Sequence, residues 1–258
     1  MKDYGLVSVI MPSYNSANYI DESIQSVIAQ TYENWELLIT DDCSTDDSIA
    51  VIERYCYLDK RIRLFRMDKN CGAGICRNRS ISEAQGRFIA FCDSDDQWYA
   101  DKLEKQLAFM IEKNCALSYT SYMMCNEVGK KVGIIVCKNS ETFSSIQCDD
   151  GIGCLTAVYD TVKVGKVYMP TIRKRQDWGL WLTVLKMCKV AYGLKEPLAV
   201  YRLRSNSISN NKLSLVKYNL KVYREILKFS MIKSYFFFFF VFLPSYFMKK
   251  IGQMYINR

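Results

Sequence analysis

The 258-residue sequence contains no histidine. This absence excludes zinc sites with histidine ligands, Ser-His-Asp triads and Cys-His dyads. Any bound metal would be held mainly by oxygen atoms, which favours Mg²⁺ or Mn²⁺. Prolines number only 4, while hydrophobic residues make up 50% of the chain. This composition excludes a disordered chain and allows one large α/β domain or two small ones.

The 11 cysteines contain no C-x-x-C pair, and no secretory signal precedes the first apolar segment. Scattered thiols of this kind are typical of reduced, buried cysteines in a cytosolic protein. The net charge of +8 suits a phosphate-bearing substrate or an anionic membrane surface. A long basic run and an RNA-binding aromatic signature are both lacking, so we expect no nucleic-acid partner.

Short apolar runs alternate with amphipathic segments in the first half of the chain. Runs rich in β-branched residues predict buried strands, and the spacing of Ile20, Ile24 and Val27 predicts one helical face. Strand–helix alternation with short links predicts an α/β fold with a mostly parallel, doubly wound sheet. We expect the four strands at residues 6–11, 35–40, 62–66 and 88–92.

The second half is harder to interpret, because its apolar pattern is less regular. Apolar segments there predict two strands joined by a turn, an apolar helix and a last strand. No linker or repeat separates this part from the first half, so we expect one domain in two lobes. The expected elements lie at residues 116–124, 131–136, 172–185 and 199–203.

Three polar clusters follow predicted strands, at residues 12–15, 41–44 and 93–96. Ligands of open α/β sheets bind outside the carboxyl ends of the strands. We therefore expect these three clusters, although distant in sequence, to meet at one edge of the sheet.

The third cluster contains three carboxylates within four positions, Asp93, Asp95 and Asp96. Like charges this close repel one another, so the cluster requires a compensating positive charge. A divalent metal ion is the leading candidate for that charge. The alternative is a solvated acidic turn, which the buried strand just before it disfavours.

Four segments together closely resemble the family-2 glycosyltransferases, bacterial enzymes of surface polysaccharide assembly. They are "SVIMPSYN", "LLITDDCSTDDS", "NCGAGICRNRSISEAQGRFIAFCDSDDQW" and "RQDWGLWL". The resemblance covers most of residues 6–204, with the motifs in the order and spacing of the family. It implies the glycosyltransferase A fold, a Rossmann-like sheet with helices on both faces. It also implies a nucleotide-sugar donor, a divalent cation and usually an inverting mechanism.

The resemblance assigns several residues to the nucleotide of the donor. Pro12, Tyr14 and Asn15 lie in the family's first loop, where Tyr14 would stack on the base or else pack at the rim. Asp41 resembles the carboxylate that accepts a hydrogen bond from the uracil ring, with Asp42 as the weaker candidate. The alternative for this second segment is helix capping. Arg77 would pair with phosphate or, alternatively, form a surface ion pair.

The resemblance also implies the metal site, which would bind Mn²⁺ or Mg²⁺. Asp95 is expected to be the direct ligand. Asp93 is expected at the donor ribose, at the metal or at metal-bound water.

A late loop, "YRLRSNSIS", resembles a segment that closes over the diphosphate. Arg202 and Arg204 are its expected phosphate-binding residues, with Ser207 and Ser209 as further candidates. Many relatives carry histidine where Arg204 stands. A guanidinium cannot bind a metal, so Arg204 is expected to clamp phosphate instead.

Asp177 corresponds to the family's catalytic base. Inversion requires a carboxylate on the acceptor side, which takes the hydroxyl proton as the acceptor oxygen attacks C1 of the donor sugar. The family often has Glu-Asp here, whereas this chain has Gln176 and Asp177. Capping of the helix that follows is the alternative role for Asp177.

The C-terminal tail contains five consecutive phenylalanines within an uncharged run at residues 234–248. This run is shorter than the roughly 20 residues that a spanning helix needs, and Lys233 and Pro244 interrupt the wider segment. We expect a helix that lies in the membrane interface, the alternative being packing on the domain or on a dimer surface. The basic residues that flank it are Lys228, Lys233, Lys249 and Lys250.

The sequence thus predicts a catalytic domain at residues 1–210, with a nucleotide-binding lobe at 1–113 and an acceptor lobe at 114–210, followed by a helical tail at 211–258. The leading hypothesis is a metal-dependent, inverting transfer from a UDP-sugar to a saccharide acceptor in O-antigen or capsule synthesis. We expect the acceptor to be lipid-linked and the protein to lie at the cytoplasmic face of the cell membrane. The alternatives are transfer to a polyprenyl phosphate and a catalytically inactive scaffold that binds nucleotide sugars.

Overall fold

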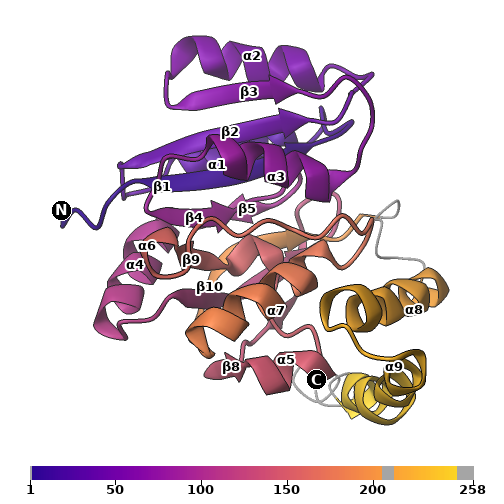
Figure 1. Cartoon of the computed structure of the whole chain (residues 1–258). Helices are drawn as coiled ribbons and strands as arrows, with labels where there is room; N and C mark the ends of the chain where they lie inside the picture. The colour runs from indigo at the N-terminus through magenta and orange to yellow at the C-terminus, as the bar shows by residue number, and fades with distance from the viewer. Residues whose placement is uncertain (1, 205–211, 249–258) are drawn as a thin grey trace.

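Ten strands form one mixed sheet in the computed structural model of the chain, which describes residues 2–204 and 212–248 (Figure 1). In spatial order the strands run β3-β2-β1-β4-β9-β6-β10-β5, with β7 paired to β6 and β8 paired to β10. The strands are β1 Val7–Ser13, β2 Trp35–Asp41, β3 Ile62–Arg66, β4 Phe88–Phe91, β5 Gln97–Trp98, β6 Leu117–Cys125, β7 Lys131–Ile135, β8 Ser140–Thr142, β9 Val158–Asp160 and β10 Val190–Arg202.

Helices connect most of the strands and follow the last one. The α-helices are α1 Ile20–Ile28, α2 Ser48–Leu58, α3 Ala73–Glu83, α4 Lys102–Glu112, α5 Phe143–Cys148, α6 Thr161–Val164, α7 Gln176–Cys188, α8 Lys212–Lys221 and α9 Met231–Phe237. A 3₁₀ turn, η1 Cys154–Thr156, and two wider π-helical segments, η2 Val222–Ile226 and η3 Phe238–Phe242, complete the set.

The four strands predicted in the first half are confirmed as β1 to β4. β1 lies between β2 and β4, β3 pairs with β2, and all these pairs are parallel. Every residue of β1 and β2 is buried, as expected for strands that helices cover on both faces. The predicted mostly parallel, doubly wound sheet is therefore correct for this half.

The second half contains a strand, β9, that the sequence did not reveal. β9 pairs antiparallel with both β4 and β6 and so joins the two halves of the sheet. β10 begins nine residues before the predicted strand, at Val190, and pairs parallel with β6 and antiparallel with β5 and β8. These long-range pairings bring the end of β10 to the edge of a cleft, which Tyr201 lines.

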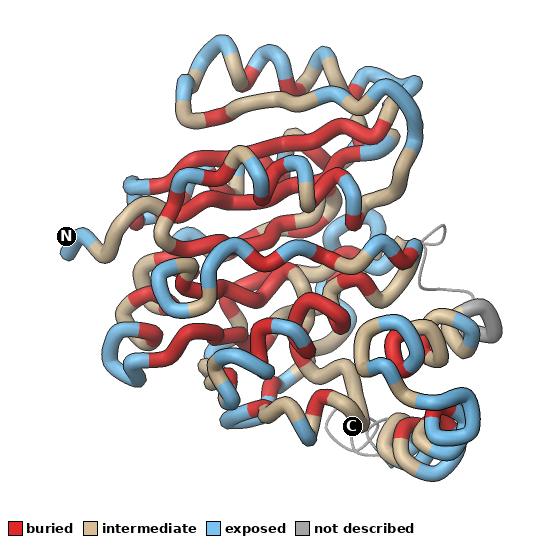
Figure 2. Tube along the Cα trace, in the orientation of Figure 1, coloured by how far each residue is buried: buried red, intermediate tan, exposed pale blue. Residues whose placement is uncertain are grey.

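Side chains of β1 alternate between two hydrophobic cores, one on each face of the sheet. Val9 and Met11 pack with α1, α2 and α4 on one face. Ile10 belongs to the core on the other face, which includes residues of α3, α7 and the tail helix. Figure 2 shows this arrangement as buried strands between helices that are exposed on their outer sides. Packing on both faces therefore holds the carboxyl ends of the strands in fixed positions.

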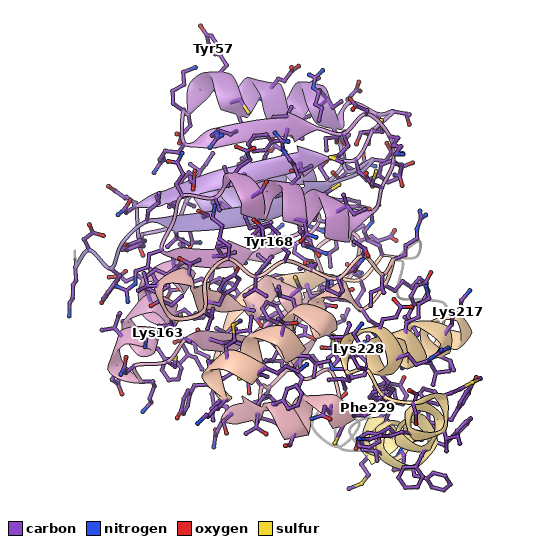
Figure 3. The ribbon with its side chains drawn as sticks, viewed as in Figure 1. Tyr57, Lys163, Tyr168, Lys217, Lys228 and Phe229 are labelled. Atoms are coloured by element: carbon purple, nitrogen blue, oxygen red, sulfur yellow. The ribbon has the colours of Figure 1, made fainter. Side chains whose placement is uncertain are left out.

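The tail forms a continuous helix from Met231 to Met248 that packs one face on α7. Phe238 and Phe242 are buried there, and the ring of Phe242 lies 5.7 Å from that of Trp178. Lys217, Lys228 and Phe229 lie in the same corner of the molecule, far from Tyr57 on α2 (Figure 3). The opposite face is exposed and carries Met231, Ile232, Tyr235, Phe236, Phe239, Phe240, Phe247 and Met248.

Pro244 does not interrupt this helix, contrary to the prediction. The helix continues to Met248, and the wider turn of η3 lies just before the proline. Proline removes one N–H and crowds the carbonyl four residues earlier, and a π-type turn accommodates both effects.

The helix Met231–Met248 is long and apolar enough to cross a membrane by length and composition alone, and 17% of it is buried in the structure. Its apolar part is thus longer than the uncharged run considered in the sequence. Lys249, Lys250, Ser207 and Ser209 lie outside the described residues.

Candidate active site

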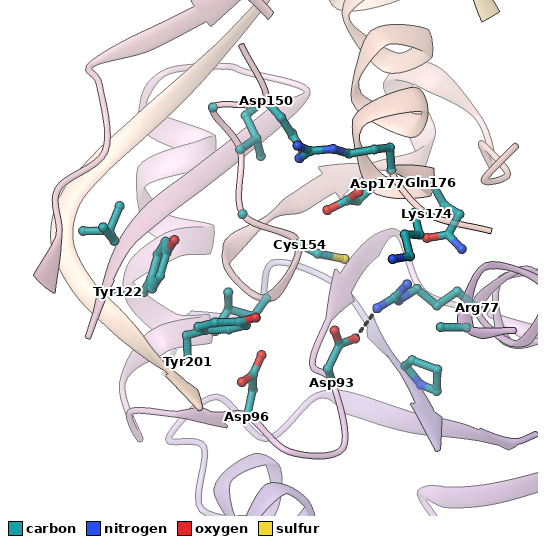
Figure 4. Close-up of a pocket in the computed structure, with 18 of the residues that line it drawn as sticks. Arg77, Asp93, Asp96, Tyr122, Asp150, Cys154, Lys174, Gln176, Asp177 and Tyr201 are labelled. Carbon is teal, nitrogen blue, oxygen red and sulfur yellow. Dashed lines mark hydrogen bonds and ion pairs between the residues drawn. The ribbon is translucent and has the colours of Figure 1, made fainter. Parts of the chain in front are cut away.

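A cleft of about 1500 Å³ opens at the carboxyl ends of β1, β2 and β4. One wall contains Pro12–Asn15, Asp42 and Asp93–Asp96, so the three polar clusters lie together as expected. The opposite wall comes from η1 and the N-terminus of α7. Figure 4 shows Asp177 on that wall, facing Asp93 and Asp96 across the opening.

Hydrogen bonds tie the first polar loop to the second. The Asn15 N–H donates to Ser44 Oγ at 2.9 Å, and Asn15 Oδ1 accepts from the Thr45 N–H at 2.8 Å. Pro12, Tyr14 and Asn15 line the cleft, where Tyr14 is 50% exposed. The half-exposed ring of Tyr14 is thus available to a flat ligand, while Asn15 mainly holds the loops together.

Asp41 does not line the cleft in the structure, although the sequence predicted that it contacts the uracil ring of the donor. It is fully buried, and its carboxylate accepts hydrogen bonds from Ser13 Oγ, the Ser44 N–H and Ser44 Oγ at 3.1, 2.8 and 2.6 Å. Asp42, one residue later, does line the cleft. Its two oxygens accept the N–H groups of Cys71 and Gly72, each at 2.7 Å. Alternation along the strand end therefore turns the second aspartate, not the first, toward the cleft.

Asp93 forms an ion pair with Arg77 from α3, with 2.6 Å between Oδ1 and Nη2. The Arg77 side chain is 8% exposed and that of Asp93 is 29% exposed. Arg77 is therefore a buried partner within the site and not a surface ion pair, although burial of its guanidinium carries a desolvation cost. Asp93 raises the pKa of Arg77 despite that burial, which keeps the arginine charged.

Asp95 and Asp96 continue the acidic cluster with different partners. Asp95 Oδ2 lies 3.1 Å from Arg204 Nη1 at the cleft wall. Asp96 is buried, and its Oδ1 accepts the Arg202 N–H at 2.9 Å. Burial, followed by repulsion from neighbouring carboxylates, raises the pKa of Asp95 and, much more strongly, that of Asp96. Arginines thus compensate part of the negative charge that the sequence assigned to a metal alone.

Arg202 is directed away from the cleft, whereas Arg204 lines it. The Arg202 guanidinium donates to the carbonyl oxygens of Asp95 and Glu127 at 3.1 and 3.0 Å, and it pairs with Glu22. These contacts fix the position of the loop that contains Asp93–Asp96. Of the two arginines assigned to the diphosphate, only Arg204 is positioned to meet a ligand.

Asp177 lies in the first turn of α7 and lines the cleft. Among the described residues its carboxylate accepts one hydrogen bond, from the Trp178 N–H at 2.9 Å. The N-terminus of a 13-residue helix favours a negative charge at this position. The N-cap position itself belongs to Arg175, so capping by Asp177 does not explain its presence.

Two neighbours fix the start of α7. Gln176 packs against Gly74 of α3, where an added Cβ would lie 2.8 Å from the Gln176 Cγ. Arg175 adopts a left-handed backbone with φ of 66°, and its guanidinium binds Asp150 and Asn219 at 3.1 and 3.0 Å. Close approach of α3 and a strained cap residue thus place Asp177 at the cleft.

The cleft also contains residues that the sequence analysis did not identify. Lys174, Asp150, Cys154, Tyr122 and Tyr201 all line it, as Figure 4 shows. Burial raises the pKa of the Cys154 thiol well above its ordinary value, which disfavours the thiolate form. Lys174 belongs to a run of three basic residues, 173–175, that is visible in the sequence just before Gln176 and Asp177. The other four residues come from segments whose position depends on pairing between distant strands.

The described residues hold no group of three or more histidine, cysteine, aspartate or glutamate side chains that could bind a metal by themselves. Asp93 and Asp95 nevertheless present carboxylate oxygens at the cleft. One or two carboxylates that act together with substrate phosphates are the usual protein ligands of Mg²⁺. These residues therefore fit a divalent cation that is bound jointly with a diphosphate.

Comparisons with known proteins place the chain in a family. Residues 8–143 match the family described as Glycosyl transferase family 2. The chain is 44% identical over 230 residues to the putative teichuronic acid biosynthesis glycosyltransferase TuaG of Bacillus subtilis (strain 168), covering 89% of this chain and 91% of the relative. It is 42% identical over 219 residues to the UDP-Glc:alpha-D-GlcNAc-diphosphoundecaprenol beta-1,3-glucosyltransferase WfgD of Escherichia coli, covering 84% of each.

A solved structure, S. aureus TarS 1-349 in complex with UDP-GlcNAc, superposes with a TM-score of 0.69 at 23% identity. The match covers 88% of this chain and 69% of TarS 1-349. This likeness shows the glycosyltransferase A fold, which confirms the predicted fold. The chain belongs to glycosyl transferase family 2.

Proposed function

We propose that this family-2 glycosyltransferase transfers a sugar from a UDP-sugar donor to a lipid-linked saccharide acceptor, with inversion at the sugar C1, in surface polysaccharide synthesis. One observation carries the proposal. A single cleft brings a donor-side group of Asp42, Arg77, Asp93 and Asp95 opposite Asp177. The relatives TuaG and WfgD act in teichuronic acid biosynthesis and on a diphosphoundecaprenol-linked sugar by name, which supports this substrate class.

In this proposal Asp177 is the catalytic base. The acceptor hydroxyl donates its proton to the Asp177 carboxylate as its oxygen forms a bond to C1 of the donor sugar. The bond between C1 and the diphosphate oxygen breaks, and UDP leaves with the electron pair. A positioned carboxylate of this kind contributes about 10²–10⁴-fold to the rate.

Asp93 and Asp95 would hold Mn²⁺ or Mg²⁺ together with the donor diphosphate. When bound, the cation would neutralise the negative charge that develops on the leaving group. Arg77 and Arg204, which pair with these two carboxylates at 2.6 and 3.1 Å, lie close enough to share the diphosphate charge. Metal and arginines would thus act on the same leaving group.

Asp42 replaces Asp41 as the residue that recognises the uracil ring. A carboxylate has about four lone-pair sites, and the two backbone N–H donors from Cys71 and Gly72 occupy only part of them. The carboxylate can therefore accept a further hydrogen bond from the N–H of the base. Tyr14, half exposed at the same wall, would stack on the ring.

The tail helix would lie in the membrane interface at the cytoplasmic face of the cell membrane. Its outer face exposes four phenylalanines, one tyrosine, one isoleucine and two methionines, a patch that water solvates poorly. Lys228 and Lys233 are exposed beside it, as expected for contact with anionic lipid. A lipid-linked acceptor would be found at that same surface.

The test is a panel of nucleotide sugars with Mn²⁺, followed by mass spectrometry for released nucleotide and for glycosylated acceptor. We expect release of UDP from at least one UDP-sugar and transfer to a saccharide carried on a lipid diphosphate. Asp101→Asn, at the N-cap of α4 and paired there with Lys105, serves as the control for Asp177→Asn, because this aspartate does not line the cleft.

Two results would contradict the proposal. Transfer to polyprenyl phosphate in place of the saccharide would favour the direct lipid acceptor. Metal-independent donor binding without any turnover, measured by titration calorimetry, would favour an inactive scaffold.

A further inference from the structure

Three consecutive basic residues, Arg173, Lys174 and Arg175, come directly before Gln176 and Asp177 and line the same cleft. Arg175 is engaged with Asp150 and Asn219. Arg173 is exposed, and the Lys174 amine lies 5.9 Å from the centre of the Tyr218 ring on α8. Figure 4 shows the Lys174 side chain directed into the cleft beside Asp177. The donor site as proposed above uses none of these three residues.

The tail reaches the cleft on this side. Leu215, Ser245 and Met248 belong to its lining, so one end of the tail helix forms part of the cleft wall. Met248 is also 73% exposed and belongs to the outer aromatic face of that helix. An apolar surface therefore continues from the acceptor side of the cleft onto the face assigned to the membrane.

We propose that Arg173 and Lys174 form a subsite for the diphosphate of the lipid-linked acceptor, between Asp177 and the tail. This inference rests on the proposed function. The diphosphate that joins a sugar to its lipid carries two negative charges, and Arg173 and Lys174 supply two positive ones. Arginine binds phosphate oxygens in a bidentate manner, and lysine acts as a point charge.

The distances along the chain suit this arrangement. In a single-sugar acceptor the reacting hydroxyl and the diphosphate are attached to one ring. The phosphate-binding cations must then lie within about one sugar of the base. Lys174 is three residues from Asp177, so their Cα atoms are at most about 10 Å apart even in an extended chain.

The donor and acceptor diphosphates would be served by separate cations. Arg77 and Arg204 lie with the donor-side carboxylates Asp93 and Asp95. Arg173 and Lys174 lie on the acceptor wall, next to the tail. Their removal should therefore affect the acceptor and not the donor.

The experiment compares the double variant R173A/K174A with the wild type on two acceptors. One is the saccharide on a short lipid diphosphate, and the other is the same saccharide as a neutral alkyl glycoside. Loss of charge-assisted hydrogen bonds should lower the ratio of kcat/KM for the diphosphate acceptor to that for the neutral one by at least about tenfold. The effect should appear mainly in KM, and R173K/K174R should restore much of it.

The matched control is R54A/K60A, which removes two positive charges near α2 at the far end of the sheet. It should leave the ratio unchanged. UDP affinity and thermal unfolding verify that R173A/K174A is folded and binds its donor.

An unchanged ratio in R173A/K174A, with normal transfer to both acceptors, would overturn the subsite and leave the proposed function intact. Wild-type protein that transfers to neither acceptor and releases no UDP would instead contradict the proposed function itself.

Discussion

The two halves of the sheet hold their cleft residues in different ways. In the donor half, Asp42 accepts two backbone N–H groups and Asp93 is paired with buried Arg77. In the acceptor half, the Asp177 carboxylate accepts one hydrogen bond among the described residues, from its own helix. The donor side is fixed by contacts between distant segments, while the acceptor side keeps one carboxylate available for a proton.

This difference matches the two tasks that we propose. Binding of a charged nucleotide benefits from groups that are already oriented, because little rearrangement is then needed. A base must exchange a proton with a substrate, and strong ion pairing would oppose that.

Asp177→Asn should have the largest effect, because the amide cannot take the acceptor proton. We expect kcat to fall by about 10²–10⁴-fold, with the affinity for UDP unchanged. Transfer kinetics and titration calorimetry provide the two measurements. A parallel loss of UDP affinity would mean that the two walls of the cleft are not independent.

Phe242→Ala should destabilise the fold, since this ring is buried against Trp178. Truncation of a buried phenylalanine costs about 3–5 kcal/mol in the free energy of unfolding. Phe240→Ala, on the exposed face of the same helix, should change it by less than about 0.5 kcal/mol.

The two variants should rank in the opposite order in binding to anionic vesicles. Phe240→Ala should weaken that binding more than Phe242→Ala does. Chemical denaturation and vesicle sedimentation distinguish the two faces. Equal effects of both variants on stability would contradict the two-faced description of the tail.

Asp95→Asn should weaken donor binding in the presence of Mn²⁺ by at least about tenfold, since even residues one step from a metal cost 10–100-fold. Binding without metal should change little. Burial raises the pKa of Asp95, so we expect the metal-dependent part to weaken as the pH is lowered and this carboxylate is protonated. Calorimetry with and without Mn²⁺ at several pH values checks this. A metal-independent loss would indicate a structural role through Arg204.

Lys102 in α4 offers a test of stability, and not of activity, within the donor half. Burial lowers the pKa of this lysine from 10.5 to about 7, so between these pH values the folded protein binds fewer protons than the unfolded chain. Wild-type stability should therefore rise with pH in this window, by less than about 1.4 kcal/mol per pH unit. In Lys102→Met this rise should disappear. Denaturation of both proteins at pH 6.5 and pH 10 measures it, and Lys113→Met, at the exposed end of the same region, should behave like the wild type.

The sequence predicted the donor half well because its order is local. Strands β1 to β4 and helix α1 follow from hydrophobic spacing alone, and the expected convergence of their polar ends is present. The structure differs from the expectation at Asp41, which is buried and does not line the cleft, because at the end of a strand one residue decides which side chain faces the cleft. Side-chain direction there depends on Ser13 and Ser44, and spacing does not reveal these partners.

The acceptor half could not be predicted to the same degree because its order is long-range. β9 has three residues, too few to show the alternating hydrophobic pattern of a strand. Its place between β4 and β6 depends on pairing with both. Arg202 shows the same limit within the site. Its motif indicated a phosphate ligand, yet contacts with Glu22 and Glu127 direct it elsewhere.

The missing side chain at Gly74 has a consequence for how this protein can change. Gln176 occupies the room that any larger residue would need, so a methyl group there would act as a wedge between α3 and α7. A substitution at residue 74, which does not line the cleft, would then displace Asp177, the proposed catalytic base. Selection for altered acceptor preference should accordingly recover compensating changes at residues 74 and 176 together, and seldom at either alone.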